Sequence, residues 1–156
     1  MSSAIVRPDH HPSEVFVFGS NLLGMHVGGA AQYAKDRCGA IDGVALGPSV
    51  VSRTFDSGMG EFQEDCVSAW AIPTCYAPGV PFNTVGEIES YVECFLHYVD
   101  RYPEHQYYVT AIGCGVAGFT PKQIAPLFIE VFRNKAVNVT LPSEFISILV
   151  QLVPDE

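Results

Sequence analysis

Three closely spaced glycines, Gly113, Gly115 and Gly118, mark the segment of the sequence with the clearest potential for binding chemistry. Residues 107–112 before them are mostly apolar and β-favouring, which is typical of a buried central strand. Residues 120–123 after them predict a helix start, because a threonine N-cap is followed by proline at the first helical position and by glutamine completing a capping box. The segment therefore predicts a strand, a glycine-rich loop and a helix in succession.

A glycine-rich loop at a helix start favours anion binding. Glycine allows backbone conformations that other residues avoid, and the first N–H groups of a helix have no partner inside it. A phosphate can accept hydrogen bonds from such groups without any basic side chain. We therefore expect a phosphate to contact this loop, whose candidate ligand-binding residues are Gly113, Cys114, Gly115, Val116, Ala117, Gly118 and Phe119. For Cys114 there are two interpretations: a nucleophile activated by the helix start, or a residue that is simply small enough for a crowded loop.

A second unit of the same kind lies near the beginning of the chain. Residues 14–18 form a short apolar run, residues 19–29 contain four glycines, and residues 30–38 are rich in helix formers. The candidate ligand-binding residues of this unit are Gly19, Ser20, Asn21, His26, Gly28, Gly29 and Ala30. We consider Asn21 and His26 as catalytic candidates, because an amide can orient a ribose or a water and an imidazole can move a proton near neutral pH. The alternatives are a turn-forming asparagine and a histidine bonded to a backbone carbonyl.

The alternation of strands and helices predicts an α/β sandwich with a largely parallel sheet. In such sheets ligands bind beyond the carboxyl ends of the strands. Both glycine loops follow strands, so they are expected to meet at one edge of the sheet. Two anion-binding loops at one edge predict a diphosphate ligand.

The elements between the two loops are less regular. Residues 40–65 are interrupted by glycine, proline and serine, which predicts either a long surface loop over a ligand cleft or an ordinary insertion. Residues 67–72 predict a strand that ends at Pro73, followed by a loop to Asn83. A capping box at residues 84–87 then opens the clearest helix of the chain, which has an apolar stripe and ends before Pro103.

The end of the chain predicts three further elements. A helix is expected from Pro121 to about Asn134, followed by a strand at residues 137–141. Residues 145–153 are apolar, and their pattern is compatible with either a strand or a helix.

Composition limits the classes of function. With 156 residues, 48% apolar and 16% charged, the chain is predicted to form one folded domain over 1–156, with residues 1–13 as a loose lead-in. A net charge of −9 with only eight Lys and Arg residues argues against a nucleic-acid partner. No apolar run is long enough for a membrane span, and the N-terminus lacks the apolar core of a signal peptide. Five cysteines without a CxxC pair are expected to be reduced thiols in the cytoplasm, and neither a metal nor a cofactor is expected.

A dinucleotide-binding fold is the first alternative for the second loop. The letters GCGVAG at 113–118 match the pattern G-x-G-x-x-G after a predicted strand. That pattern normally opens a long dinucleotide-binding domain, whereas only 38 residues follow Gly118. The remaining chain is too short for the other strands, so this interpretation is not favoured.

Both loops taken together resemble macro domains. The letters FGSN at 18–21 and GGAA at 28–31 resemble their first ligand loop, and GCGVAGF at 113–119 resembles their second phosphate loop. With AIPT at 71–74 and IAPLF at 124–128, the order is similar to a family of bacterial and phage-encoded macro-like proteins, over most of the chain. The resemblance implies a three-layer α/β/α sandwich with a mixed, largely parallel central sheet and a cleft for ADP-ribose or a related nucleotide.

The resemblance also implies roles for individual residues. Asn21 would lie near the distal ribose, and residues 28–30 would donate amides to the diphosphate or line that ribose. Residues 113–118 would wrap the diphosphate from the other side, and Phe119 would stack against the distal ribose. The aspartate that the hydrolytic branch often carries in the second loop is replaced by Ala117.

Three hypotheses on function follow. The chain binds ADP-ribose or a related nucleotide diphosphate without turnover, or it hydrolyses ADP-ribosyl or ADP-ribose phosphate esters through Asn21 and His26. In the third hypothesis it is an interaction protein whose cleft no longer binds a ligand. The expected partner under the first two is a small-molecule nucleotide.

Overall fold

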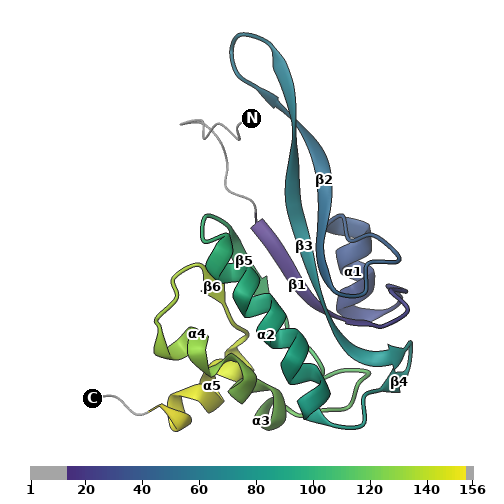
Figure 1. Cartoon of the computed structure of the whole chain (residues 1–156), viewed down its shortest axis with the longest axis vertical. Helices are drawn as coiled ribbons and strands as arrows, with labels where there is room; N and C mark the ends of the chain where they lie inside the picture. Colours follow the sequence, from purple (N-terminus) through teal and green to yellow (C-terminus); the bar gives the residue numbers. More distant parts are fainter. Residues whose placement is uncertain (1–13, 154–156) are drawn as a thin grey trace.

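The computed structural model of the chain describes residues 14–153, so the predicted lead-in at residues 1–13 lies outside the described residues. Within that range a six-stranded sheet lies between helices (Figure 1). The strands are β1 (Glu14–Asn21), β2 (Gly47–Asp56), β3 (Glu61–Ala77), β4 (Val80–Pro81), β5 (Gln106–Val109) and β6 (Val139–Thr140). The helices are α1 (Gly29–Arg37), α2 (Val85–Arg101), α3 (Pro121–Ile124), the 3-10 helix η1 (Ala125–Phe128), α4 (Ile129–Arg133) and α5 (Ser143–Leu152).

The sheet is mixed, with its parallel strands at the centre. Its order is β2-β3-β1-β5-β6, and β4 pairs with the end of β3. β1 runs parallel to both β3 and β5, and β5 runs parallel to β6, whereas β2 and β4 are antiparallel to β3. The α/β class and the largely parallel sheet predicted from the sequence are confirmed.

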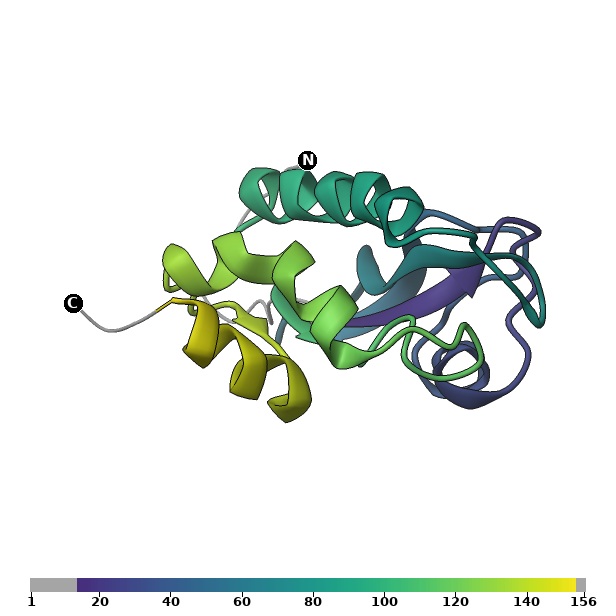
Figure 2. The same cartoon turned by 90° about the horizontal axis from the view of Figure 1, so that it is seen from below.

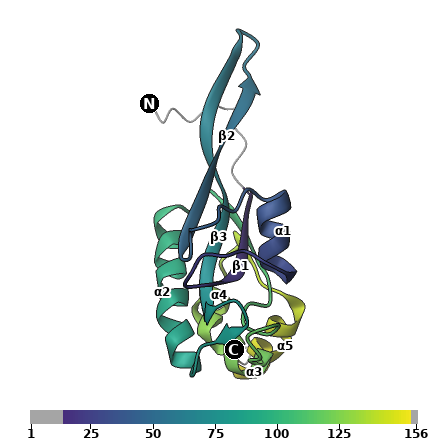
Figure 3. The ribbon, with the colours of Figure 1, turned by 90° about the vertical axis from the view of Figure 1, so that its right-hand side faces the viewer.

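Helices cover both faces of the sheet (Figures 2 and 3). α2 lies on one face and begins with the predicted capping box, in which the side chain of Glu87 accepts hydrogen bonds from the backbone N–H of Asn83 and Thr84. Its apolar stripe packs into the main core with the residues of β1 and β5 that point to the same side. The stripe residues buried there are Ile88, Val92, Phe95 and Val99, whereas Tyr102, just after the helix, is exposed.

α1 covers part of the opposite face and packs closely, because small side chains form the contact. Ala31 and Ala34 of the helix lie in one cluster with Ala69 and Ala71 of β3 and Phe18 of β1. No helix of residues 14–153 is long and apolar enough to cross a membrane.

The helix expected from Pro121 to about Asn134 is broken into α3, η1 and α4. Pro126 explains the break, because proline has no N–H for the bond to the carbonyl of Lys122 and its ring crowds that carbonyl. The capping box predicted at its start is present between Thr120 and Gln123. The undecided segment 145–153 proves to be helical: α5 buries Phe145 and Leu149, and the Phe145 ring stacks on Phe128 with 5.8 Å between centroids.

The prediction of a loop at residues 40–65 is wrong for most of that segment. β2 and the first part of β3 form a long antiparallel hairpin there, which projects beyond the rest of the sheet (Figure 1). Its strands are held together by cross-strand pairs such as Phe55 and Phe62, whose ring centroids are 5.5 Å apart. Pro73 does not end β3, which continues to Ala77. Other boundaries differ by a few residues: β1 extends to Asn21, and β6 is limited to Val139–Thr140.

Candidate functional site

The two glycine loops meet at one cavity of about 520 Å³ at the carboxyl ends of β1, β3 and β5. The first loop contributes the end of β1 and the start of α1 to its wall. The second contributes residues 110–117, which follow β5 directly. Segments that are about 90 residues apart in the chain therefore line the same space because β1 and β5 are neighbours in the sheet. The lining residues from the two loops are Gly19, Ser20, Asn21, Val27, Gly28, Gly29, Ala30, Ala31, Thr110, Ala111, Ile112, Gly113, Cys114, Gly115, Val116 and Ala117.

The start of α1 leaves three backbone N–H groups available at this cavity. Gly28 is the N-cap with φ of 76°, a conformation that favours glycine, and it supplies no side-chain cap. The N–H groups of Gly29, Ala30 and Ala31 have no hydrogen-bond acceptor among residues 14–153. The first turn also contains no acidic side chain. This helix start therefore has an uncompensated positive end.

The second loop leaves another three such groups. The N–H of Gly118 donates to the carbonyl of Gly115 over 3.0 Å, which closes a tight turn. The backbone N–H groups of Gly115, Val116 and Ala117 have no hydrogen-bond acceptor among residues 14–153. Consecutive free N–H groups in a turn form an anion-binding concavity.

Gly113 holds the second loop against the core. It has φ of 74°, and a Cβ atom built on it would lie 3.1 Å from Cδ1 of Ile124. A larger residue would therefore be strained in its backbone and crowded against the core. The N–H of Phe119 donates to the carbonyl of Gly113 over 2.8 Å, which leads the chain toward α3.

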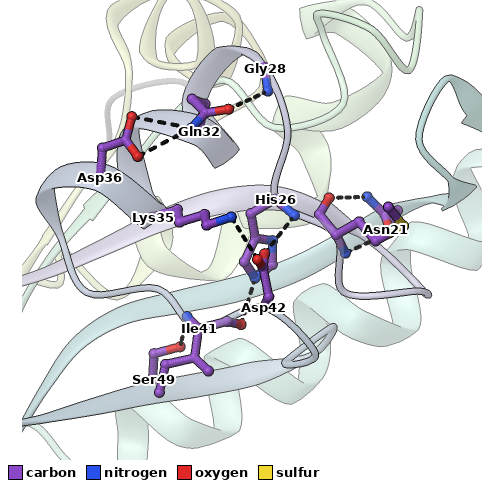
Figure 4. Close-up of polar contacts among 10 residues, drawn as sticks. Asn21, His26, Gly28, Gln32, Lys35, Asp36, Ile41, Asp42 and Ser49 are labelled. Atoms are coloured by element: carbon purple, nitrogen blue, oxygen red, sulfur yellow. Dashed lines mark hydrogen bonds and ion pairs between the residues drawn. The ribbon is translucent and has the colours of Figure 1, made fainter.

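The side chain of Asn21 holds the first loop (Figure 4). Its Oδ1 accepts hydrogen bonds from the backbone N–H of Leu23 at 3.1 Å and of Met25 at 3.2 Å. Its Nδ2 donates to the carbonyl of Met25 at 2.8 Å. Asn21 thus lines the cavity while its side chain fixes the turn that leads toward α1, as expected of a turn-forming asparagine.

The structure does not place His26 in the cavity, contrary to the expected ligand contact and catalytic role. Its side chain is fully buried, with its ring edge-on to Phe18 at 5.1 Å between centroids. Nε2 lies 3.0 Å from the carbonyl oxygen of Ile41, and the backbone N–H donates to Asp42 (Figure 4). The alternative of a histidine bonded to a backbone carbonyl describes what is observed. Asp42 in turn pairs with Lys35 at 2.6 Å.

Other predicted residues take varied positions. Gly118 and Phe119 do not line the cavity, and Phe119 packs partly buried against the main core, so the structure does not show it as a stacking platform. Ser20 lines the cavity, but its hydroxyl donates to the carbonyl of Ala45. Burial, with a smaller contribution from the charge of Glu144, raises the pKa of the Cys114 thiol. Cys114 is therefore a neutral thiol near pH 7, which argues against a nucleophile.

Sequence reasoning missed the contribution of β3 and the turn after it. The cavity residues from this region are Thr74, Cys75, Pro78 and Gly79. The Thr74 hydroxyl donates to the carbonyl of Ser20 at 3.3 Å and so ties β3 to the end of β1. Only the parallel pairing of β3 with β1 identifies these residues, because a proline such as Pro73 by itself predicts the end of a strand.

Comparisons with known proteins address the fold. No family model and no curated protein matches the sequence. The structure matches that of Thermosipho africanus DarTG in complex with ADP-ribose, with a TM-score of 0.53 and 18% identity, over 83% of this chain and 38% of that chain. A macrodomain protein from Streptomyces coelicolor matches with a TM-score of 0.40 and 13% identity, over 86% of this chain and 90% of that chain. The chain has a macro domain-like fold.

The macro domain-like fold confirms the family resemblance of the two loops at the level of architecture. Within its cavity, the lining residues among 14–153 include no Asp, Glu, His, Lys or Arg. An anion in this macro domain-like cavity would therefore be stabilised by backbone dipoles and not by charged side chains. No cluster of metal-ligating side chains is present among the described residues.

Proposed function

We propose that the chain binds ADP-ribose or a related nucleoside diphosphate in the cavity between its two glycine loops. The observation that carries this proposal is the meeting of two sets of unpartnered backbone N–H groups, at residues 29–31 and 115–117, around one cavity. A diphosphate has two anionic groups, and each set of N–H groups can accommodate one of them. The choice of ligand is supported by the ADP-ribose bound in the DarTG complex, 38% of whose chain matches this structure.

The size and polarity of the cavity support a ligand of this class. At about 520 Å³ it falls within the range of small-molecule sites, which is about 300–1,000 Å³. Backbone donors explain how a chain with net charge −9 can bind an anion, because no basic patch is needed. An open cavity of this size also argues against the hypothesis of an interaction protein whose cleft no longer binds a ligand.

Binding without turnover fits the lining better than hydrolysis. Hydrolysis of an ADP-ribosyl ester needs a group that activates water or protonates the leaving oxygen. Of the two residues considered for this, His26 is buried away from the cavity and Asn21 uses its side chain to hold a turn. Nothing in the described lining favours catalysis, so binding is the proposed function.

Isothermal titration calorimetry of the full chain with ADP-ribose tests the proposal. We expect one site per chain and at least about tenfold weaker binding of AMP, because AMP lacks the second phosphate. Absence of both heat and thermal stabilisation at millimolar ADP-ribose would contradict it. Incubation with an ADP-ribosylated protein tests the hydrolytic alternative, and we expect the modification to persist.

A further inference from the structure

A second cavity, of about 640 Å³, lies at the other end of β1. Glu14 at the beginning of β1 lines it, whereas Asn21 at the end of that strand lines the first cavity. Its wall is formed by the start of β1, the end of α1, the β2–β3 hairpin and β5. None of its lining residues belongs to the first cavity, so the two cavities are separate sites.

A row of aromatic rings forms part of this second cavity. The ring of Phe16 lies beside that of Tyr33 from α1, with 5.1 Å between centroids, and Phe16 is the register partner of Tyr108 on β5. Tyr33 is 51% exposed and Tyr108 is 41% exposed, so both rings offer accessible surface. Exposed tyrosine rings are platforms on which a planar ring can stack.

Two arginines line the same cavity. Arg37 follows Tyr33 by one helical turn on α1, so the two side chains lie on one face of the helix, and Arg53 comes from β2. Within the described part of the chain neither guanidinium is in an ion pair. Glu14 is the one carboxylate in the lining, and Arg53 is also the register partner of Glu64 on β3. Two guanidinium groups against one lining carboxylate leave a positive balance at the cavity, which favours an anionic ligand.

A buried hydroxyl in the same wall lacks a partner. Ser68 of β3 is one of the lining residues and is 3% exposed. Its Oγ has no hydrogen bond in the described structure. A buried hydroxyl without a partner is unfavourable, because it has lost its bonds to water. Its oxygen has almost no accessible surface, so Ser68 takes no part in the ligand contacts proposed below.

We propose that the second cavity binds a small planar anion, the class to which nucleoside monophosphates belong. The planar ring stacks beside Tyr33 and Tyr108, and the anionic group is bound by Arg37 and Arg53. A polynucleotide fits less well, because a chain with net charge −9 repels a long polyanion and two arginines neutralise only two phosphates.

The test is a titration of the full ¹⁵N-labelled chain with AMP, followed by amide chemical shifts. ADP-ribose is left out, because it contains an adenylate group that would compete with AMP for the second cavity. We expect shifts at Phe16, Tyr33 and Tyr108, with dissociation in the millimolar range or tighter. Adenosine alone and inorganic phosphate alone should each bind at least about tenfold more weakly than AMP, because each retains only one of the two contacts. The shifts distinguish the second cavity from the first whether or not the first binds ADP-ribose, since the two cavities share no residues.

A double variant supplies the second measurement. Arg37→Gln with Arg53→Gln should weaken AMP binding at the second cavity at least about tenfold, whereas Arg101→Gln, exposed at the end of α2, should leave it unchanged. The proposal is overturned by AMP shifts confined to residues 29–31 and 115–117, by no shifts at about 10 mM AMP, or by equal AMP affinity in the double variant. Tighter binding of a ten-residue oligonucleotide than of AMP at this cavity would also overturn the assignment to a small ligand.

Discussion

Replacing Ala30 with aspartate separates anion binding from folding, because affinity should fall while stability stays nearly unchanged. Ala30 is the second residue of α1, is exposed and lines the first cavity. An acidic side chain at a helix N-terminus stabilises the helix by about 0.3–1 kcal/mol, which offsets the lower helix propensity of aspartate, about 0.7 kcal/mol at most. We therefore expect the melting temperature of Ala30→Asp to remain close to that of the parent chain.

The same charge should weaken binding of the diphosphate strongly. Two like charges about 4 Å apart repel by about 1 kcal/mol in water and by about 4 kcal/mol at an effective dielectric constant of about 20. The diphosphate carries two charges, so even the aqueous value gives about 2 kcal/mol, which is about a thirtyfold loss of affinity. The loss should decrease as salt is added, because added ions screen the repulsion.

Calorimetry with ADP-ribose at low and high salt, together with thermal unfolding, provides the assay. Ala30→Asn is the control for shape, because it has nearly the same size without the charge. Val137→Asp is the control for net charge, since Val137 is 94% exposed and does not line the cavity. Equal affinity of Ala30→Asp and the parent chain would refute the reasoning. Equal losses in the aspartate and asparagine variants would show that shape, and not charge, controls binding.

Three further predictions concern the loops and α2. Gly115→Val should fold normally, because a Cβ atom at Gly115 meets no heavy atom within 4 Å. It should lose at least about tenfold in ADP-ribose affinity by calorimetry, because the added side chain enters the cavity that Gly115 lines. Unchanged affinity in the folded variant would contradict this. Asn21→Ala should lower the free energy of unfolding by about 1–3 kcal/mol in denaturant titrations, because it leaves the partners in the turn unsatisfied, and a loss below about 0.5 kcal/mol would argue against that role. The Tyr76 hydroxyl donates a hydrogen bond to Glu87 and lowers the pKa of that carboxyl, so the bond stabilises the fold above the unfolded pKa and is lost as pH falls through the lower folded pKa. A carboxyl NMR titration of Tyr76→Phe should show a higher pKa for Glu87, and an unchanged value would contradict the assignment.

The glycine loops could be predicted from the sequence because their signals are local. A strand, closely spaced glycines and a capping box lie within about 15 residues around Gly113, and each has its own physical reason. That both loops meet at one cavity follows from a general property of parallel sheets, which brings the carboxyl ends of β1 and β5 together. Helix α2 could be predicted for the same reason, because the signals of its capping box and its apolar stripe are equally local.

The elements that sequence reasoning missed depend on contacts between distant residues. The hairpin of β2 and β3 is held by pairing across strands, which the glycine and serine content of residues 40–65 does not reveal. His26 looked accessible because glycines surround it in the sequence, whereas Ile41 and Phe18 bury it in the fold. The wall contributed by Thr74 and Cys75 depends on the register of β3 with β1, which no local pattern specifies.

The most direct test of the central claim is a titration of the ¹⁵N-labelled chain with ADP-ribose, monitored by amide chemical shifts. The amides of residues 29–31 and 115–117 should shift together and report one dissociation constant, because both sets of N–H groups contact one diphosphate. Shifts in only one of these two sets, or shifts confined to other residues, would contradict the claim that the two loops form a single diphosphate site.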